Sequence, residues 1–210
     1  MEIFTGKRIL TFISLLVLFF LFYVPKVSAQ DSTESEEADT VVRKLVDQQS
    51  VLPLECAHVK AGITKDAEVQ KMYGQGTLDK SEGHSGARFY TDPQHKVQLR
   101  TVIGPDGVIE EVSLSASGYP FDFVSVGKAT AAMTSALNAS SSTEKGIRIG
   151  DTPEKVIEKF GQPNSNETEV DMRTITYEET NEHWKAVENY TAVFLFRHEK
   201  LVRVTIYNGE

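Results

Sequence analysis

The hydrophobic and polar positions are most regularly arranged between residues 150 and 163, in the sequence GDTPEKVIEKFGQP. Val156, Ile157 and Phe160 fall on one side of a helical wheel, and most of the remaining positions are polar or charged. The pattern predicts a helix over Thr152–Phe160. Because a helix of about two turns is not stable alone in water, its apolar face must pack against another element.

Both ends of this helix are marked in the sequence. Thr152 is a suitable N-cap, because its hydroxyl can accept a hydrogen bond from a free backbone N–H of the first turn. Pro153 fits the next position, where no N–H is needed. Gly161 favours the left-handed conformation that ends many helices, and Pro163 prevents continuation.

A stretch upstream follows the same order. It predicts a helix over Thr64–Tyr73, with Thr64 as the candidate N-cap and a glycine after the last residue. When Val69 is aligned with Val156, the aromatic residue and the glycine that end each helix also align. The two stretches therefore indicate an internal repeat.

A similar series of strands follows each helix. Residues 97–103 alternate between apolar and polar side chains and are joined to residues 108–115 by a Gly-Pro-Asp-Gly turn. In the second half, residues 191–197 and 201–207 are strongly β-prone and are joined by a tight turn. Each half thus predicts a helix, a loop, a short strand and a long hairpin.

These elements predict an α+β fold of two tandem units, each a short helix packed on a small antiparallel β-sheet. The predicted units span residues 51–117 and 146–210, with a linker at 118–145. In the strand at 191–197, valine and leucine point to one side and two phenylalanines to the other. We expect the helix to cover one side and either the sister unit or a partner to cover the other, and burial between the units is the default.

The N-terminus has the features of a secretory signal. Lys7 and Arg8 precede an uncharged apolar run over Ile9–Val24, and Val27-Ser28-Ala29 offers a cleavage site after Ala29. The alternative is an uncleaved membrane anchor, although the run is shorter than the ~20 residues that span a bilayer. Since no cysteine follows the run, the protein is not expected to be a lipoprotein. We predict a secreted or periplasmic protein.

Composition narrows the choice of partners. Removal of residues 1–29 takes away three basic residues and one acidic residue, and changes the net charge from −8 to −10. Nucleic acids are therefore excluded, because phosphate binding needs a basic face. Residues 30–50 form an acidic segment with a helical pattern in its second half. The single cysteine, Cys56, has apolar neighbours that favour burial, and pairing between chains is the alternative.

Residues 150–163, followed by a terminal β-hairpin, resemble the SmpA/OmlA family of small outer-membrane lipoproteins that assist the barrel-assembly machinery. They are also similar to the β-lactamase-inhibitor-protein fold, a tandem of two α/β units. The resemblance covers residues 146–207 well and 59–115 weakly. It implies an exported protein-binding module, and its Gly-x-Thr…Val…Phe-Gly-x-Pro pattern serves capping and packing.

Residues that could support catalysis do not form a recognisable set. Ser85 is not in a Gly-x-Ser-x-Gly elbow, and Glu110 and Glu111 point to opposite faces of a strand. The five histidines lack metal-ligand spacing: His58, His84, His95, His183 and His198. We therefore expect no enzyme, no cofactor and no metal. The alternative is an enzyme or small-ligand sensor with its site in the cleft between the two units.

Aromatic residues of the second half are the candidates for partner binding. Trp184 lies in a polar stretch, and tryptophan is enriched at interface hot spots. Tyr177, Tyr190 and Tyr207 are close to it along the chain. The alternative is that Trp184 caps one edge of the core. We expect the partner to be another envelope or secreted protein, with membrane contact only through an uncleaved signal segment.

Three asparagines begin acceptor sequences for N-glycosylation: Asn138, Asn166 and Asn189. Such sequences are used only in a eukaryotic host, which the sequence does not identify.

Overall fold

A computed structural model describes residues 52, 55–80, 85–118, 131–183 and 186–209. The predicted signal peptide, the acidic segment at 30–50 and Trp184 lie outside these residues. No helix in the described ranges has the length and apolar character needed to cross a membrane.

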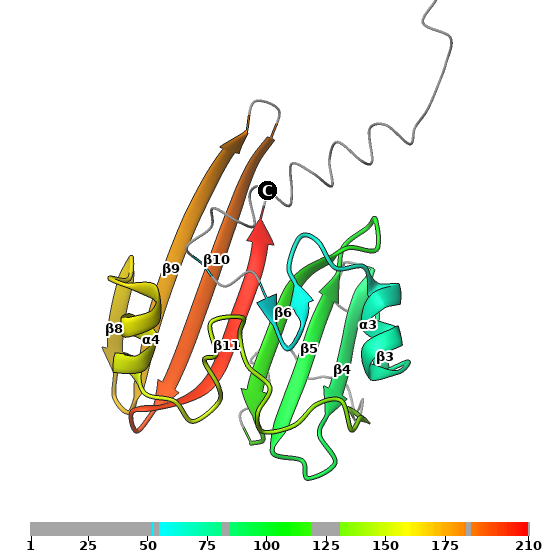
Figure 1. Cartoon of the computed structure of the whole chain (residues 1–210), viewed down its shortest axis with the longest axis horizontal. Helices are drawn as coiled ribbons and strands as arrows, with labels where there is room; N and C mark the ends of the chain where they lie inside the picture. The colour runs from blue at the N-terminus through cyan, green and yellow to red at the C-terminus, as the bar shows by residue number, and fades with distance from the viewer. Residues whose placement is uncertain (1–51, 53–54, 81–84, 119–130, 184–185, 210) are drawn as a thin grey trace, which may run out of the picture. The chain divides into compact units, whose positions relative to one another are not determined.

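The described residues contain two short helices and eleven strands (Figure 1). The helices are α3 (Asp66–Tyr73) and α4 (Pro153–Phe160). The strands are β1 (Glu55–Cys56), β2 (Val59–Lys60), β3 (Thr77–Asp79), β4 (Gly86–Thr91), β5 (Val97–Ile103), β6 (Ile109–Ala116), β7 (Ala132–Met133), β8 (Ser165–Glu169), β9 (Met172–His183), β10 (Ala186–Arg197) and β11 (Lys200–Gly209).

The predicted fold class, α+β with two tandem helix-on-sheet units, is wrong. The chain is mostly β, and nine of its strands form one large sheet in the order β3-β4-β5-β6-β11-β10-β9-β8, with β7 beside β4. All pairings along this path are antiparallel. One apolar core beneath the sheet includes residues of both helices. The side-chain pattern predicted strands at the positions of β5, β6, β10 and β11, but it does not specify which strand lies next to which.

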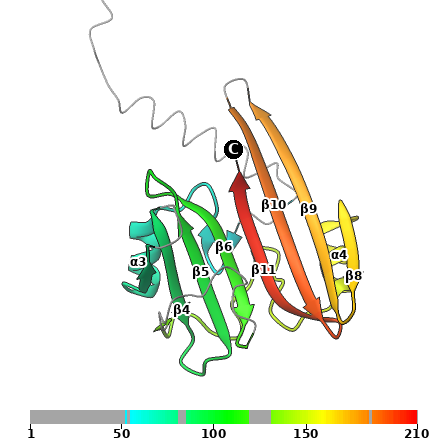
Figure 2. The ribbon, with the colours of Figure 1, turned by 180° about the vertical axis from the view of Figure 1, so that it is seen from behind.

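The two halves of the chain join where β6 pairs with β11. Five residue pairs, from Arg203 opposite Ser115 to Tyr207 opposite Glu111, form this junction. Each half contributes four strands to the main order, and the order is symmetric about the junction. Both helices lie on the same face of the sheet, and Figure 2 shows the opposite face.

Helix α4 begins and ends where the sequence predicts. The Thr152 hydroxyl accepts a hydrogen bond from the Lys155 N–H at 3.5 Å, and Pro153 is the first helical residue. Gly161 has a positive φ of 80°, and its N–H donates to the Ile157 carbonyl at 2.8 Å.

Helix α3 begins one residue later than predicted. Its N-cap is Lys65, whose backbone N–H donates to the Glu68 carboxylate at 3.0 Å. Thr64 has another role, since its hydroxyl accepts a hydrogen bond from the Lys60 N–H at 2.8 Å. The threonine therefore closes the turn that follows β2 instead of capping the helix.

Equivalent tyrosines hold the end of each helix to the sheet. The Tyr90 hydroxyl donates to the Gly74 carbonyl at 3.1 Å, and the Tyr177 hydroxyl donates to the Gly161 carbonyl at 3.0 Å. In both cases the partners are 16 residues apart. Each tyrosine ring also packs against the last residue of its helix, with centroids 5.5 Å apart at Tyr73 and 5.6 Å apart in the second half.

The loop before each helix is bound to the final hairpin of its own half. In each half, one residue of that hairpin accepts from a glycine N–H and donates to a carbonyl just before the helix. The bonds are Gly62 N to Ile109 O (2.7 Å), Ile109 N to Thr64 O (2.8 Å), Gly150 N to Leu201 O (2.8 Å) and Leu201 N to Asp151 O (2.8 Å). The contacts of the two halves therefore repeat, although the halves share one sheet.

The packing of Gly76 against Tyr90 can be tested with two matched substitutions. Gly76 has a positive φ of 63°, and a Cβ there would lie 2.7 Å from the Tyr90 ring. Gly107 also has a positive φ, of 80°, but the space around it is open. We expect Gly107→Ala to cost about 1 kcal/mol and Gly76→Ala about 2–4 kcal/mol, because overpacking adds to the left-handed strain. Urea unfolding measures both, and equal losses would contradict this account.

Candidate protein-binding face of the sheet

Strand β10 is apolar on both sides, but the described helices cover only one of them. Phe194 and Phe196 are fully buried, and the Phe194 ring packs on Phe160 of α4 with centroids 5.4 Å apart. Val193 and Leu195 point to the opposite side and are only half-buried. Partly exposed aliphatic side chains therefore lie on the face away from α4.

The register of the strands shows which residues surround Val193 and Leu195. We call this surface the open face; it consists of alternate residues of β9, β10 and β11, namely Thr174, Thr176, Glu178, Thr191, Val193, Leu195, Arg203, Thr205 and Tyr207. In the view of Figure 2, no described helix or strand lies over these three strands. The side chains are threonines around an aliphatic centre, with one aromatic ring, and two charged residues, Glu178 and Arg203, lie among them.

The structure separates the four aromatic residues proposed from the sequence. Tyr177 and Tyr190 are buried in the core, at 3% and 2% exposed, and Tyr177 is bonded to Gly161. Tyr207 lies on the open face and is 39% exposed. Trp184 lies outside the described residues. Of the three described residues, only Tyr207 is accessible to a partner.

A network of polar side chains crosses the junction of the two halves, on the side of the sheet that carries the open face. Arg100 of β5 donates to the Glu111 carboxylate at 2.5 Å, and the Ser113 hydroxyl donates to the same oxygen at 2.9 Å. The Ser113 and Thr205 hydroxyls are 2.9 Å apart. Since Ser113 has one hydroxyl proton, Thr205 must be the donor in that bond.

This network holds the open face in position relative to the first half. It links β5 and β6 to Thr205 of β11, which is part of the open face. The network was not predicted from the sequence. Glu111, Ser113 and Ser115 alternate with apolar residues, and this pattern is typical of a strand with one solvated side. In fact Ser113 and Ser115 are at most 1% exposed. Alternation alone does not distinguish a solvated face from a buried polar one.

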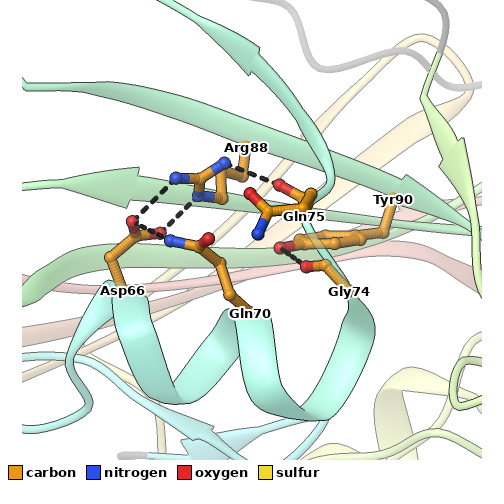
Figure 3. Close-up of polar contacts among 6 residues, drawn as sticks. All are labelled: Asp66, Gln70, Gly74, Gln75, Arg88 and Tyr90. Carbon is orange, nitrogen blue, oxygen red and sulfur yellow. Dashed lines mark hydrogen bonds and ion pairs between the residues drawn. The ribbon is translucent and has the colours of Figure 1, made fainter.

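A second polar cluster fixes α3 to β4 (Figure 3). The Arg88 guanidinium forms two bonds to the Asp66 carboxylate, at 2.5 and 2.9 Å, and a third to the Gln75 carbonyl at 2.6 Å. Gln70 also donates to Asp66, at 2.7 Å. The hydrogen bonds to Asp66 raise the pKa of Arg88, although burial alone would lower it. The cluster is largely buried, so its role is structural.

The equivalent positions of the second half are apolar. When Gly74 is aligned with Gly161, Asp66 corresponds to Pro153 and Arg88 corresponds to Ile175. Both Pro153 and Ile175 are buried. The fold therefore accommodates either a buried ion pair or apolar packing between this part of the helix and the sheet.

The remaining titratable groups offer no assembled catalytic set among the described residues. His58 lies 3.3 Å from Glu55 but is mostly exposed, and His95 and His198 are in turns with positive φ. No cluster of metal-binding side chains occurs within the described ranges. Cys56 is fully buried, and burial raises the pKa of its thiol. The two halves join edge to edge through β6 and β11.

Comparisons with known proteins identify no family. No family model and no curated protein matches the sequence. The chain is similar to a solved structure of a DUF4309 family protein, YjgB from Bacillus subtilis, with 14% sequence identity. The alignment covers 72% of this chain and 82% of the YjgB chain. Its TM-score is 0.38, and a likeness at this level carries no argument about fold or function.

The Asp66–Arg88 pair can be tested against the apolar solution of the second half. Arg88→Met leaves the Asp66 carboxylate buried without its main partner, and we expect a loss of about 3 kcal/mol. The double variant Asp66→Ala/Arg88→Ile removes both charges and should cost less than Arg88→Met alone, because no charge is left unpaired. Urea unfolding of the two variants and the parent decides this. A double variant less stable than the single one would contradict the interpretation.

Alkaline titration tests the environment of the helix-end tyrosines. Burial raises the pKa of Tyr90 from 10 to about 12; burial, with nearby negative charges, does the same for Tyr73. Because the pKa of each tyrosine is higher in the folded than in the unfolded chain, its protonated hydroxyl makes its full contribution to the unfolding free energy below pH 10. This contribution falls as the pH rises towards 12. Absorbance at about 295 nm should show a late phase that Tyr73→Phe and Tyr90→Phe each reduce. A late phase unchanged in both variants would be evidence against the assignment.

Proposed function

We propose that this protein is an exported, non-enzymatic protein-binding module and that a partner protein of the envelope or secreted fraction binds its open face. The observation that carries the proposal is the two-sided apolar character of β10. Phe194 and Phe196 are buried in the core on the α4 side, whereas Val193 and Leu195 are partly exposed on the side without a described helix. A strand of this kind suits a position between two covering layers.

The sister half does not provide the second layer. It continues the sheet sideways through β6 and β11, so it adds strands next to β11 and covers neither side of β10. The sequence analysis considered two coverings for this side of the strand, the sister unit and a partner; the strand pairing speaks against the sister unit, and we propose the partner.

The composition of the open face also suits a protein partner. Tyrosine is enriched at interface hot spots, and Tyr207 is exposed beside Thr191 at the edge of the aliphatic centre. Threonine hydroxyls offer hydrogen bonds without the desolvation cost of a charge. The face lies on three hydrogen-bonded strands, which limits the entropy lost on binding.

Export is proposed from residues 1–29, which have the charge, apolar run and cleavage site of a secretory signal. The resemblance of residues 150–163 to the SmpA/OmlA family supports a role in the cell envelope. The alternative, an enzyme or sensor with a site in a cleft between two units, has less support, because the halves meet by strand pairing.

Site-specific cross-linking in the host tests the open face. A photoreactive amino acid at position 207 should form an adduct with the partner. The same amino acid at position 158, on the exposed side of α4, should not. We expect Leu195→Lys to reduce the adduct at position 207 at least tenfold, because a charge at the centre of an interface is costly. Glu158→Lys is the matched control and should leave the adduct unchanged.

The fold of each variant is checked by its unfolding free energy. Leu195 is partly exposed, so its replacement should cost about 1 kcal/mol or less. Adducts at position 158 but not at 207, or an adduct at 207 that Leu195→Lys leaves intact, would refute binding at the open face.

A further inference from the structure

The hairpin of β9 and β10 is longer than the strands on either side of it. On one side, β8 pairs with β9 only as far as Thr176. On the other side, β11 pairs with β10 only as far as Asn189. Residues 181–183 and 186–188 form three further pairs that no described strand flanks (Figure 1).

The backbone of β9 presents hydrogen-bonding groups along its outer edge. The Thr176 carbonyl accepts from the Asn164 N–H at 2.9 Å, so the even-numbered residues of β9 direct their backbone groups outwards. The Glu178 N–H is occupied by the Asn164 side chain at 2.9 Å. By the same alternation, the backbone N–H and C=O groups of Thr180 and Glu182 also point outwards. No described strand lies beside these two residues.

Several devices that normally block such an edge are absent from the described part of β9. The strand contains no proline, and its register with β10 runs from Met172 to His183 without a bulge. From the Glu178 carbonyl onwards the edge is therefore a regular template for one more strand, and its glutamates restrict that strand to one of opposite charge. The loop at Asn164 turns away towards α4, so an added strand would continue the line of β8.

The charge of this part of the chain selects the partner. Residues 178–188 contain four glutamates and one lysine. The side chain of Glu178 is exposed and lies on the open face. Pairing of two copies along this edge would place like charges opposite each other, which is destabilising. Lysine or arginine at alternate positions of an incoming strand would instead form cross-strand pairs of opposite charge.

We propose that the outer edge of β9, from Glu178 to Glu182, binds an extended, lysine- or arginine-rich segment of a partner protein as an added antiparallel strand. The inference rests on the proposed protein-binding function and names its recognition mode. In such binding, backbone hydrogen bonds supply affinity and alternate side chains supply specificity.

The test uses the full mature chain and a synthetic seven-residue peptide in which lysine alternates with valine and threonine. Nuclear magnetic resonance titration should show saturable shifts of the Thr180 amide. A peptide with glutamate in place of lysine should bind at least tenfold more weakly. A lysine peptide with its edge-facing amides N-methylated keeps its charge but cannot donate, and it should also lose at least tenfold.

Two variants at one position separate the backbone from the side chain. Thr180→Pro removes the outward N–H and should reduce binding at least tenfold, whereas Thr180→Val keeps the N–H and should bind like the parent. Both variants lose the hydrogen bond from the Thr180 hydroxyl to Asn189, so this loss cannot account for a difference in binding between them. Glu178→Lys should reverse the preference between the lysine and glutamate peptides.

Equal binding of the methylated peptide, or no binding of the lysine peptide at millimolar concentration, would overturn the proposal. Dimerisation of the parent that Thr180→Pro abolishes would also overturn it in favour of a second copy. Cross-linking at position 207 is independent of these results, so failure of the edge and failure of the open face can be told apart.

Discussion

The pairing of β6 with β11 is the interaction on which the rest of the structure depends. Each half alone would be a sheet of four main strands with one short helix, in a segment near the lower size limit for independent folding. Backbone pairing of five residues from each strand converts the two small sheets into one. The core then runs continuously beneath both halves, from Tyr73 to Phe160, and neither half needs a core of its own.

The same junction determines which surface is left open. Two sheets that stacked face to face would bury both sides of β10. Two sheets that join edge to edge leave one side of every strand to be covered by something else. The helices, with the β1–β2 hairpin, cover one side, and on the other side Arg100 and Ser113 beside the junction are buried. The surface around Val193 and Leu195, on the same side, is partly exposed.

Local structure was predictable from the sequence where a backbone rule acts within a few residues. Thr152, Pro153 and Gly161 specify the ends of α4, because capping and proline geometry depend only on neighbours. The start of α3 was displaced by one residue, because Thr64 has a competing partner in the turn after β2. The continuity of the sheet could not be predicted, since any strand with free edges can pair with any other.

Side-chain exposure was harder to predict than secondary structure. Tyr177 and Tyr190 were proposed as binding residues because tyrosine is common at interfaces, yet tyrosine is equally suited to a core that offers its hydroxyl a partner. For Tyr177 the Gly161 carbonyl is that partner. The sequence does contain the signal, because Tyr90 has the same spacing from Gly74. A tyrosine that recurs at a fixed distance from a helix-ending glycine indicates packing, and Tyr207, which was not matched in this way, is the one left on the surface.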